Sequence, residues 1–314
     1  MKYVVTALGI LLAGLAGVAL ASCGAGAGAQ SAGPVPTSKV QPAAVPALSG
    51  SGTDTIASTL STGTGSSAGA GAAHKITYQV WFHRGEQLFV VRRTIKATPR
   101  VGTAALDSLL AGPSDDERTA GVETQVPSGT QLLALAINKG IATVDLTSEY
   151  QAGGGSASMT MRLAQVVCTL DQFPTVRGVL FALDGRRIDV IGGEGIVIDH
   201  PLTCTSYDDL LPAILVESPP IGQDISNPVT VSGSANVFEA NVTVEIVDLT
   251  GHVVGTKFVT ATCGTGCRGT FSVTVPYEVN VTQHGTIVVH DDDAAGTGHP
   301  PHEVRIPVIL EPAS

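Results

Sequence analysis

The chain has 314 residues, a length that suggests about two domains at roughly 100–200 residues each. Its 17 Lys and Arg against 27 Asp and Glu give a net charge of -10, which argues against a nucleic-acid partner because phosphate binding relies on clustered positive charge. Fibrous classes are excluded as well, since the sequence has neither a collagen-like glycine period nor a heptad run.

The N-terminus has the pattern of a signal peptide. Lys2 precedes an uncharged apolar stretch, which ends in Leu20-Ala21-Ser22-Cys23. This ending resembles a bacterial lipobox, in which a peptidase cleaves before the cysteine and a diacylglyceryl group is attached to its sulfur. The resemblance implies that residues 1–22 are removed and that acyl chains such as palmitate on Cys23 anchor the protein to the extracytoplasmic face of the cell membrane. The alternative is an uncleaved transmembrane helix, for which the stretch is short and rich in Gly and Ala.

The next segment is predicted to be a tether. Between residues 24 and 73 the sequence is almost wholly Gly, Ala, Ser, Thr, Pro and Val, with Lys39 and Asp54 as its charged residues. Such a composition buries too little apolar surface to offset the entropy of ordering. We therefore expect residues 23–75 to be a disordered linker with an r.m.s. reach on the order of 40 Å.

Residues 76–209 show the alternation of strand and helix patterns that is typical of an α+β domain. Hydrophobic periodicity changes from 2 to 3.6 residues and back, and Asn138-Lys139-Gly140 and Asp184-Gly185 are hairpin signals. We expect helices on one face of a mainly antiparallel sheet. The predicted elements, in chain order, are strands over 76–82 and 88–93, a helix over 101–110, strands over 132–137 and 141–146, a helix capped by Ser158 that runs to about Gln172, and strands over 176–183 and 186–191.

Residues 213–311 contain no convincing helix pattern, and Asp208-Asp209 with Pro212 mark the boundary before them. About seven short strands with turn residues between them predict an all-β sandwich of immunoglobulin type. The buried Trp and disulfide pattern of antibody domains is absent from this segment. The predicted strands cover 214–217, 228–233, 241–248, 253–260, 269–275, 286–290 and 303–310.

Several short motifs in the two predicted domains carry a family resemblance. Those in the first domain are Leu109-Leu110-Ala111-Gly112-Pro113-Ser114, Val126-Pro127-Ser128-Gly129-Thr130, Ile141-Ala142-Thr143-Val144-Asp145-Leu146, Arg162-Leu163-Ala164-Gln165 and Gln172-Phe173-Pro174. Together they resemble the GerMN domain of bacterial sporulation and spore-germination lipoproteins. Those in the second domain are Ser218-Pro219-Pro220, Asn227-Pro228-Val229 and Ile306-Pro307-Val308. With these motifs the last 100 residues resemble the immunoglobulin-like domain that follows GerMN in many such proteins.

The resemblance implies a non-catalytic cell-envelope lipoprotein, of a family in which some members take part in sporulation or germination. We expect its two modules to bind an envelope protein or peptidoglycan, with the membrane engaged through the lipid. One alternative is an accessory regulator of an envelope sensor kinase. The other is a cell-wall hydrolase, whose pair of carboxylates would be recognisable only in space.

Four cysteines remain once Cys23 is assigned to lipidation, and in an exported chain four thiols allow three connectivities. Cys263 and Cys267 close a short loop between two predicted strands, which favours their pairing. Cys168 and Cys204 would then pair and fix the C-terminal end of the first domain. A zinc site is the alternative, but the paired C-x2-C spacing is missing.

Two further clusters are candidate binding sites. His290 is followed by Asp291, Asp292 and Asp293, and clustered carboxylates attract hard cations; the alternative is a solvated loop between the last two strands. We expect no metal or other cofactor there. Arg92, Arg93, Lys96 and Arg100 form a basic stretch that could contact anionic wall polymer or lipid head groups, or simply guard a sheet edge.

Overall fold

The computed structural model describes residues 74–292 and 302–313. The predicted signal peptide, Cys23 and the linker up to residue 73 lie outside these ranges, and so does Asp293. Within the described ranges, no helix combines the length and the apolarity that crossing a bilayer requires.

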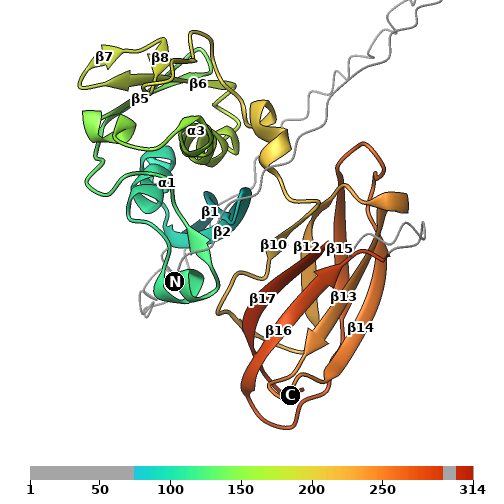
Figure 1. The fold of residues 1–314 in the computed structure, drawn as a ribbon. Helices are drawn as coiled ribbons and strands as arrows, with labels where there is room; N and C mark the ends of the chain where they lie inside the picture. Colours follow the sequence, from blue (N-terminus) through green and yellow to red (C-terminus); the bar gives the residue numbers. More distant parts are fainter. Residues whose placement is uncertain (1–73, 293–301, 314) are drawn as a thin grey trace, which may run out of the picture. The chain divides into compact units, whose positions relative to one another are not determined.

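The first domain places its two long helices between two sheets (Figure 1). Both α1 and α3 contact β1 of one sheet, while α1 also contacts β4, and α3 contacts β6, of the other. The strands are β1 (Lys75–Arg84), β2 (Gln87–Lys96), β3 (Val122–Glu123), β4 (Leu132–Asn138), β5 (Ile141–Leu146), β6 (Gly178–Leu183), β7 (Arg186–Arg187), β8 (Val190–Ile191) and β9 (Ile196–Val197). The helices are α1 (Val101–Leu110), α2 (Asp115–Thr119) and α3 (Ser156–Asp171), with 3-10 turns η1 (Ser148–Gln151) and η2 (Cys204–Leu210).

The α+β class is confirmed, but the predicted layering is wrong. The sequence led us to expect one sheet with helices on one face, whereas the structure has a sheet on each side of the helices. The reason lies in α3, because 11 of its 16 residues are buried. A helix that is buried nearly all round needs partners on more than one side.

The two sheets have the strand orders β2-β1-β3 and β4-β5-β6-β7. The hairpin of β4 and β5 turns at Lys139 and Gly140, both of which have a positive φ, as a tight two-residue turn requires. Strands β5 and β6 are parallel, so the chain between them must cross over, and α3 makes that crossover. The hairpin predicted over 176–191 is much shorter than expected, because β7 has only two residues and β8 pairs with β9 instead.

Two helix boundaries also differ from the sequence prediction. Helix α3 begins at Ser156 with Gly155 as its N-cap, so Ser158 is not the cap. Helix α2 was not predicted, although its capping box is complete: the Ser114 side chain accepts from the Glu117 N–H and the Glu117 carboxylate accepts from the Ser114 N–H.

The second domain is the predicted β-sandwich of two sheets, with orders β10-β12-β15 and β11-β17-β16-β13-β14. Alternate residues Val242, Val244 and Ile246 of β13 are buried, as the period of a strand requires. All seven predicted strands are present, and the two-residue β11 is additional. The bounds are β10 (Ile214–Ser218), β11 (Asp224–Ile225), β12 (Val229–Ala235), β13 (Asn241–Val247), β14 (Val253–Thr260), β15 (Gly269–Val275), β16 (Gln283–His290) and β17 (Glu303–Leu310), with the 3-10 turn η3 (Phe238–Ala240).

Candidate functional site

A row of polar side chains on α3 completes the hydrogen bonding of strand β1. Thr169 Oγ1 accepts from the Trp81 N–H at 3.0 Å, and Gln165 Nε2 donates to the Trp81 carbonyl at 3.2 Å. Just beyond the helix, the Gln172 amide both accepts from the Gln79 N–H and donates to its carbonyl, each at 2.7 Å. A helix thus supplies side-chain groups where a neighbouring strand would supply backbone groups. We call Gln165, Thr169 and Gln172 the α3 clamp.

Sequence reasoning missed this role. Apolar residues such as Met159 and Leu163 carry the helical periodicity of α3, and they are buried. Yet Gln165 and Thr169 have no exposed surface at all. Buried amide and hydroxyl groups need hydrogen-bond partners, so polar residues at i, i+4 and i+7 on an otherwise apolar helix are the signal that could have indicated the clamp.

Arg162, one turn earlier on α3, holds the loop that precedes the helix. Its guanidinium donates to the backbone carbonyls of Gln125, Tyr150, Ala152 and Gly153, and its Nε–Gln125 distance is 2.9 Å. Burial lowers the pKa of Arg162 below its ordinary value. The residue remains a structural support, because its donors are turned toward main-chain oxygens.

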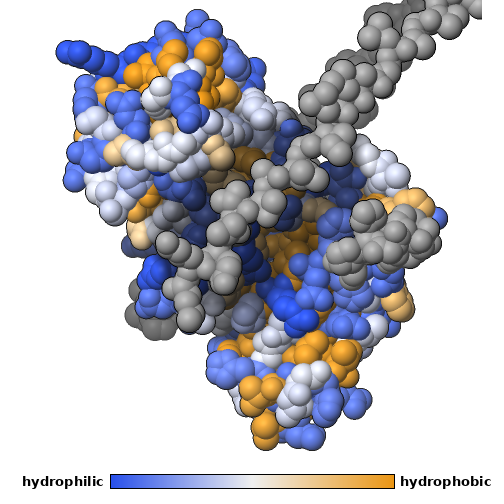
Figure 2. All heavy atoms as spheres, viewed as in Figure 1, coloured by the Kyte–Doolittle hydropathy of each residue, from blue (hydrophilic) through white to orange (hydrophobic). Residues whose placement is uncertain are grey.

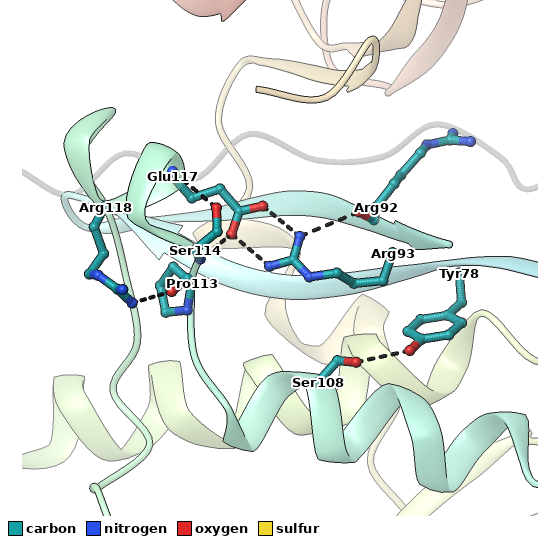
Figure 3. A network of polar contacts seen from close by, with 8 residues as sticks. All are labelled: Tyr78, Arg92, Arg93, Ser108, Pro113, Ser114, Glu117 and Arg118. Atoms are coloured by element: carbon teal, nitrogen blue, oxygen red, sulfur yellow. Dashed lines mark hydrogen bonds and ion pairs between the residues drawn. The ribbon is translucent and has the colours of Figure 1, made fainter. Parts of the chain in front are cut away.

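The basic stretch on β2 is divided between the two faces of the strand. Figure 3 shows the Arg93 guanidinium facing the Glu117 carboxylate, while the Arg92 side chain points away from it. The Arg93–Glu117 pair is bidentate, with N–O distances of 2.5 and 2.6 Å, and Glu117 is buried. Arg92 donates to the carbonyl and the carboxylate of Glu217.

These pairs change what the basic stretch can bind. Arg92 and Arg93 already have carboxylate partners, and successive strand residues point in opposite directions. Lys96 and Arg100 are exposed and form no ion pair within the described part of the chain. The four residues are therefore not gathered into one cationic surface, and we do not propose them as a polyanion site.

We expect the Arg93–Glu117 pair to contribute to stability in a pH-dependent way. Burial alone raises the pKa of Glu117, but the hydrogen bonds from Arg93 and from the Ser114 N–H outweigh it and leave the pKa below its ordinary value. Glu117→Gln is therefore expected to cost about 2 kcal/mol of unfolding free energy at neutral pH. A carboxyl whose pKa is lowered by folding stabilises the folded state fully at pH values above its pKa in the unfolded chain, which for Glu is near 4.3. This stabilisation is lost as the pH falls through the lower pKa of the folded state.

Urea titrations followed by Trp81 fluorescence test this, because the chain has one tryptophan and it lies in the first domain. The difference in unfolding free energy between wild type and Glu117→Gln should have its full size at neutral pH and shrink in acid. Glu123→Gln, at an exposed position on β3, serves as the control and should change little. A gap that stays constant into acid would contradict the ionic origin of the effect.

The structure joins the cysteines in two disulfides, Cys168 to Cys204 and Cys263 to Cys267. The first ties the last turn of α3 to the start of η2, and the second closes the short loop before β15. With all four sulfurs in disulfides, the zinc alternative has no thiolate ligands in this state.

The acidic run after β16 is occupied by local contacts. The Asp291 carboxylate accepts from the His302 backbone N–H at 2.6 Å and lies 2.8 Å from His302 Nδ1. Asp292 lies 3.6 Å from His290 Nδ1. Across residues 74–292 and 302–313, no three His, Cys, Asp or Glu side chains converge as a metal site would require.

The most exposed apolar elements of the first domain lie along strand β4 and in the β8–β9 ladder. In β4, Leu133 is 50% exposed and Ile137 is 45% exposed. Val190 and Val197 face each other across β8 and β9 and are 51% and 58% exposed. Figure 2 shows apolar surface at the end of the domain where Figure 1 labels β6 and β8. Exposed apolar side chains that gather on one strand or ladder are candidates for an interaction surface.

Strand β4 combines this exposure with a free edge. Among the described residues it pairs with β5 alone, so one side of its backbone has no strand partner. Its sequence, Leu132–Asn138, contains no charge and no proline. By contrast, β2 at the edge of the other sheet carries three basic residues, which is a common protection against strand addition.

Two family models match the chain. Residues 73–189 match Germane, described as sporulation and spore germination, and residues 213–297 match Gmad2, an immunoglobulin-like domain of bacterial spore germination. A search of curated proteins found no match.

Similar regions were also found in solved structures. The first GerMN domain of the sporulation protein GerM from Bacillus subtilis is 20% identical, and the match covers 41% of this chain and 98% of that one with a TM-score of 0.36. A candidate lipoprotein from Clostridium perfringens is also 20% identical, with 42% and 89% covered and a TM-score of 0.32. The tandem GerMN domains of the Bacillus subtilis protein are 14% identical, with 77% and 62% covered and a TM-score of 0.37.

The family matches and the two folds agree with the resemblance noted in the sequence. The chain thus consists, over its described residues, of a GerMN domain followed by an immunoglobulin-like domain of the bacterial spore-germination kind.

Proposed function

We propose that this protein is a non-catalytic lipoprotein, anchored through Cys23 on the outer side of the cell membrane, whose GerMN domain recognises another envelope protein. The lipobox pattern and the low-complexity segment after it support the anchor and the tether. The spore-germination descriptions of both matched families support an envelope role.

The observation that carries the recognition role is the free edge of β4, which has no charged residue and whose one irregularity is a register shift at its start, between Leu132 and Ala134. An extended peptide segment can add to such an edge, with main-chain hydrogen bonds providing affinity and alternate side-chain contacts providing specificity. The exposed Leu133 and Ile137 offer apolar contacts on either end of the strand. The absence of charge within Leu132–Asn138 favours an apolar segment as the partner.

A photo-reactive residue at Ala136 tests this in cells that express the full-length protein. Ala136 is exposed on β4, so we expect a crosslink to one envelope protein, through an extended segment of it. The same probe at Asp107, exposed on α1, is the matched control and should give no such product. Ala134→Lys places a charge on the edge and should remove the crosslink while leaving the fold intact.

The anchor is tested in the same cells. Cys23→Ala should leave the precursor unprocessed or release the protein from the membrane fraction. Crosslinking that is equal from both probe positions, or unchanged by Ala134→Lys, would contradict recognition through β4. A full-length protein that yields no protein crosslink and sediments with purified peptidoglycan would make wall polymer the partner instead.

A further inference from the structure

A cleft of about 600 Å³ opens on the first domain, away from β4. Its walls come from the turn between β1 and β2, the residues around Gln125, the first two turns of α3, and the end of η2. Neither the disulfides nor the matched families account for it. Its floor is lined by hydrogen-bonding side chains and its rim by acidic ones, and both limit which ligands fit.

Three polar residues form a hydrogen-bonded chain in the floor. His83 is 3% exposed, and its Nδ1 lies 2.8 Å from the Gly85 carbonyl, which can only accept, so Nδ1 carries the proton. His83 Nε2 therefore accepts from Gln125 Nε2 at 3.3 Å, and Gln125 Oε1 accepts from Ser158 Oγ at 2.6 Å. Because the Ser158 hydroxyl proton is donated to Gln125, the lone pairs of Ser158 Oγ remain available as acceptors.

The rim is acidic. Glu86 and Asp209 line the cleft, both are exposed, and neither forms an ion pair within the described ranges. No Lys or Arg lies among the lining residues. The apolar part of the lining comes from Met161, which is 5% exposed, and from the half-buried Leu210. Acceptors, negative charge and a short apolar wall suit a donor-rich cation on an aliphatic stem.

We propose that this cleft binds an alkylammonium group, such as the side chain of a lysine-like residue in a peptide. The carboxylates of Glu86 and Asp209 attract the ammonium, Ser158 Oγ is an additional acceptor, and the methylene stem lies on Met161 and Leu210. This site is separate from the β4 edge and goes beyond the proposed recognition role, so either one can fail without the other.

Saturation-transfer NMR with the full-length protein in detergent micelles tests the proposal, because this method detects weak ligands. The probes are an end-blocked Ala-Lys-Ala peptide, the same peptide with norleucine in place of lysine, and the free diamine cadaverine. We expect saturation of the lysine side-chain methylenes and none of norleucine, which has a similar stem without the charge. Binding should weaken as salt is raised from about 50 mM to about 500 mM.

The variant Glu86→Gln/Asp209→Asn should weaken binding of the lysine peptide about tenfold. Asp107→Asn removes one exposed acid outside the cleft and should leave binding unchanged. If the lysine peptide binds more tightly than cadaverine, the ligand is a peptide. If the two bind equally well, the ligand is a free amine. Equal saturation of the norleucine peptide, or an unchanged affinity in the double variant, would overturn the proposal.

Discussion

Replacing Gln165 with Leu is expected to lower the unfolding free energy of the first domain by about 3 kcal/mol. Gln165 has no exposed surface, and its amide bonds to the Trp81 carbonyl and to the Gln125 N–H. Leucine has a similar volume, so little cavity forms. The cost comes from leaving buried main-chain groups without partners, each of which costs about 1–3 kcal/mol.

Urea unfolding monitored through Trp81 is well suited to this measurement, since the reporter is itself a residue that the α3 clamp contacts. Gln151→Leu is the matched control, because Gln151 is exposed in η1 and the same chemical change there should stay within about 0.5 kcal/mol. If Gln165→Leu proved as mild as the control, water would have to satisfy the freed groups and the clamp would not be a stabilising feature.

Removal of the Cys168–Cys204 disulfide is expected to have an effect of similar size. The bond joins residues 36 apart in the sequence, and the chain-entropy model gives about 3–4 kcal/mol for a loop of that length. The Cys263–Cys267 bond spans only four residues, for which the same model gives about 2 kcal/mol. The double variant Cys168→Ala/Cys204→Ala should therefore unfold at clearly lower urea concentration.

The second disulfide provides an internal control for the first. Cys263→Ala/Cys267→Ala changes the immunoglobulin-like domain, so it should leave the Trp81 transition where it is. Comparing reduced and oxidised wild-type protein should reproduce the effect of the Cys168→Ala/Cys204→Ala variant. A Trp81 transition that is insensitive to both reduction and substitution would show that η2 docks on α3 without the bond.

Strand positions could be predicted well from the sequence because local signals set them. In the second domain, alternation and turn residues gave β14, β15 and β17 with the bounds that the structure has. In the first domain, the helix predicted over 101–110 matches α1 for the same reason. Local patterns of this kind need no knowledge of the partner element.

The arrangement of the first domain could not be predicted, because it depends on long-range pairing. Nothing local indicates that β5 pairs in parallel with β6 across α3 rather than in a simple meander. The five-residue α2 is too short for a periodic signal, although the Ser114 and Glu117 capping box was present in the sequence. The cleft was equally hidden, since His83, Gln125 and Ser158 come from three separate segments.

The α3 clamp also has a consequence for the order in which the newly made chain becomes native. Strand β1 depends on groups that follow it by 84 to 93 residues, and ribosomes add roughly 5–20 residues each second. The groups of α3 that bond to the Trp81 main chain are thus made roughly 5–20 s after Trp81 itself. The earliest part of the domain to be synthesised can therefore complete its native hydrogen bonding only after a helix from the other half of the domain has been made.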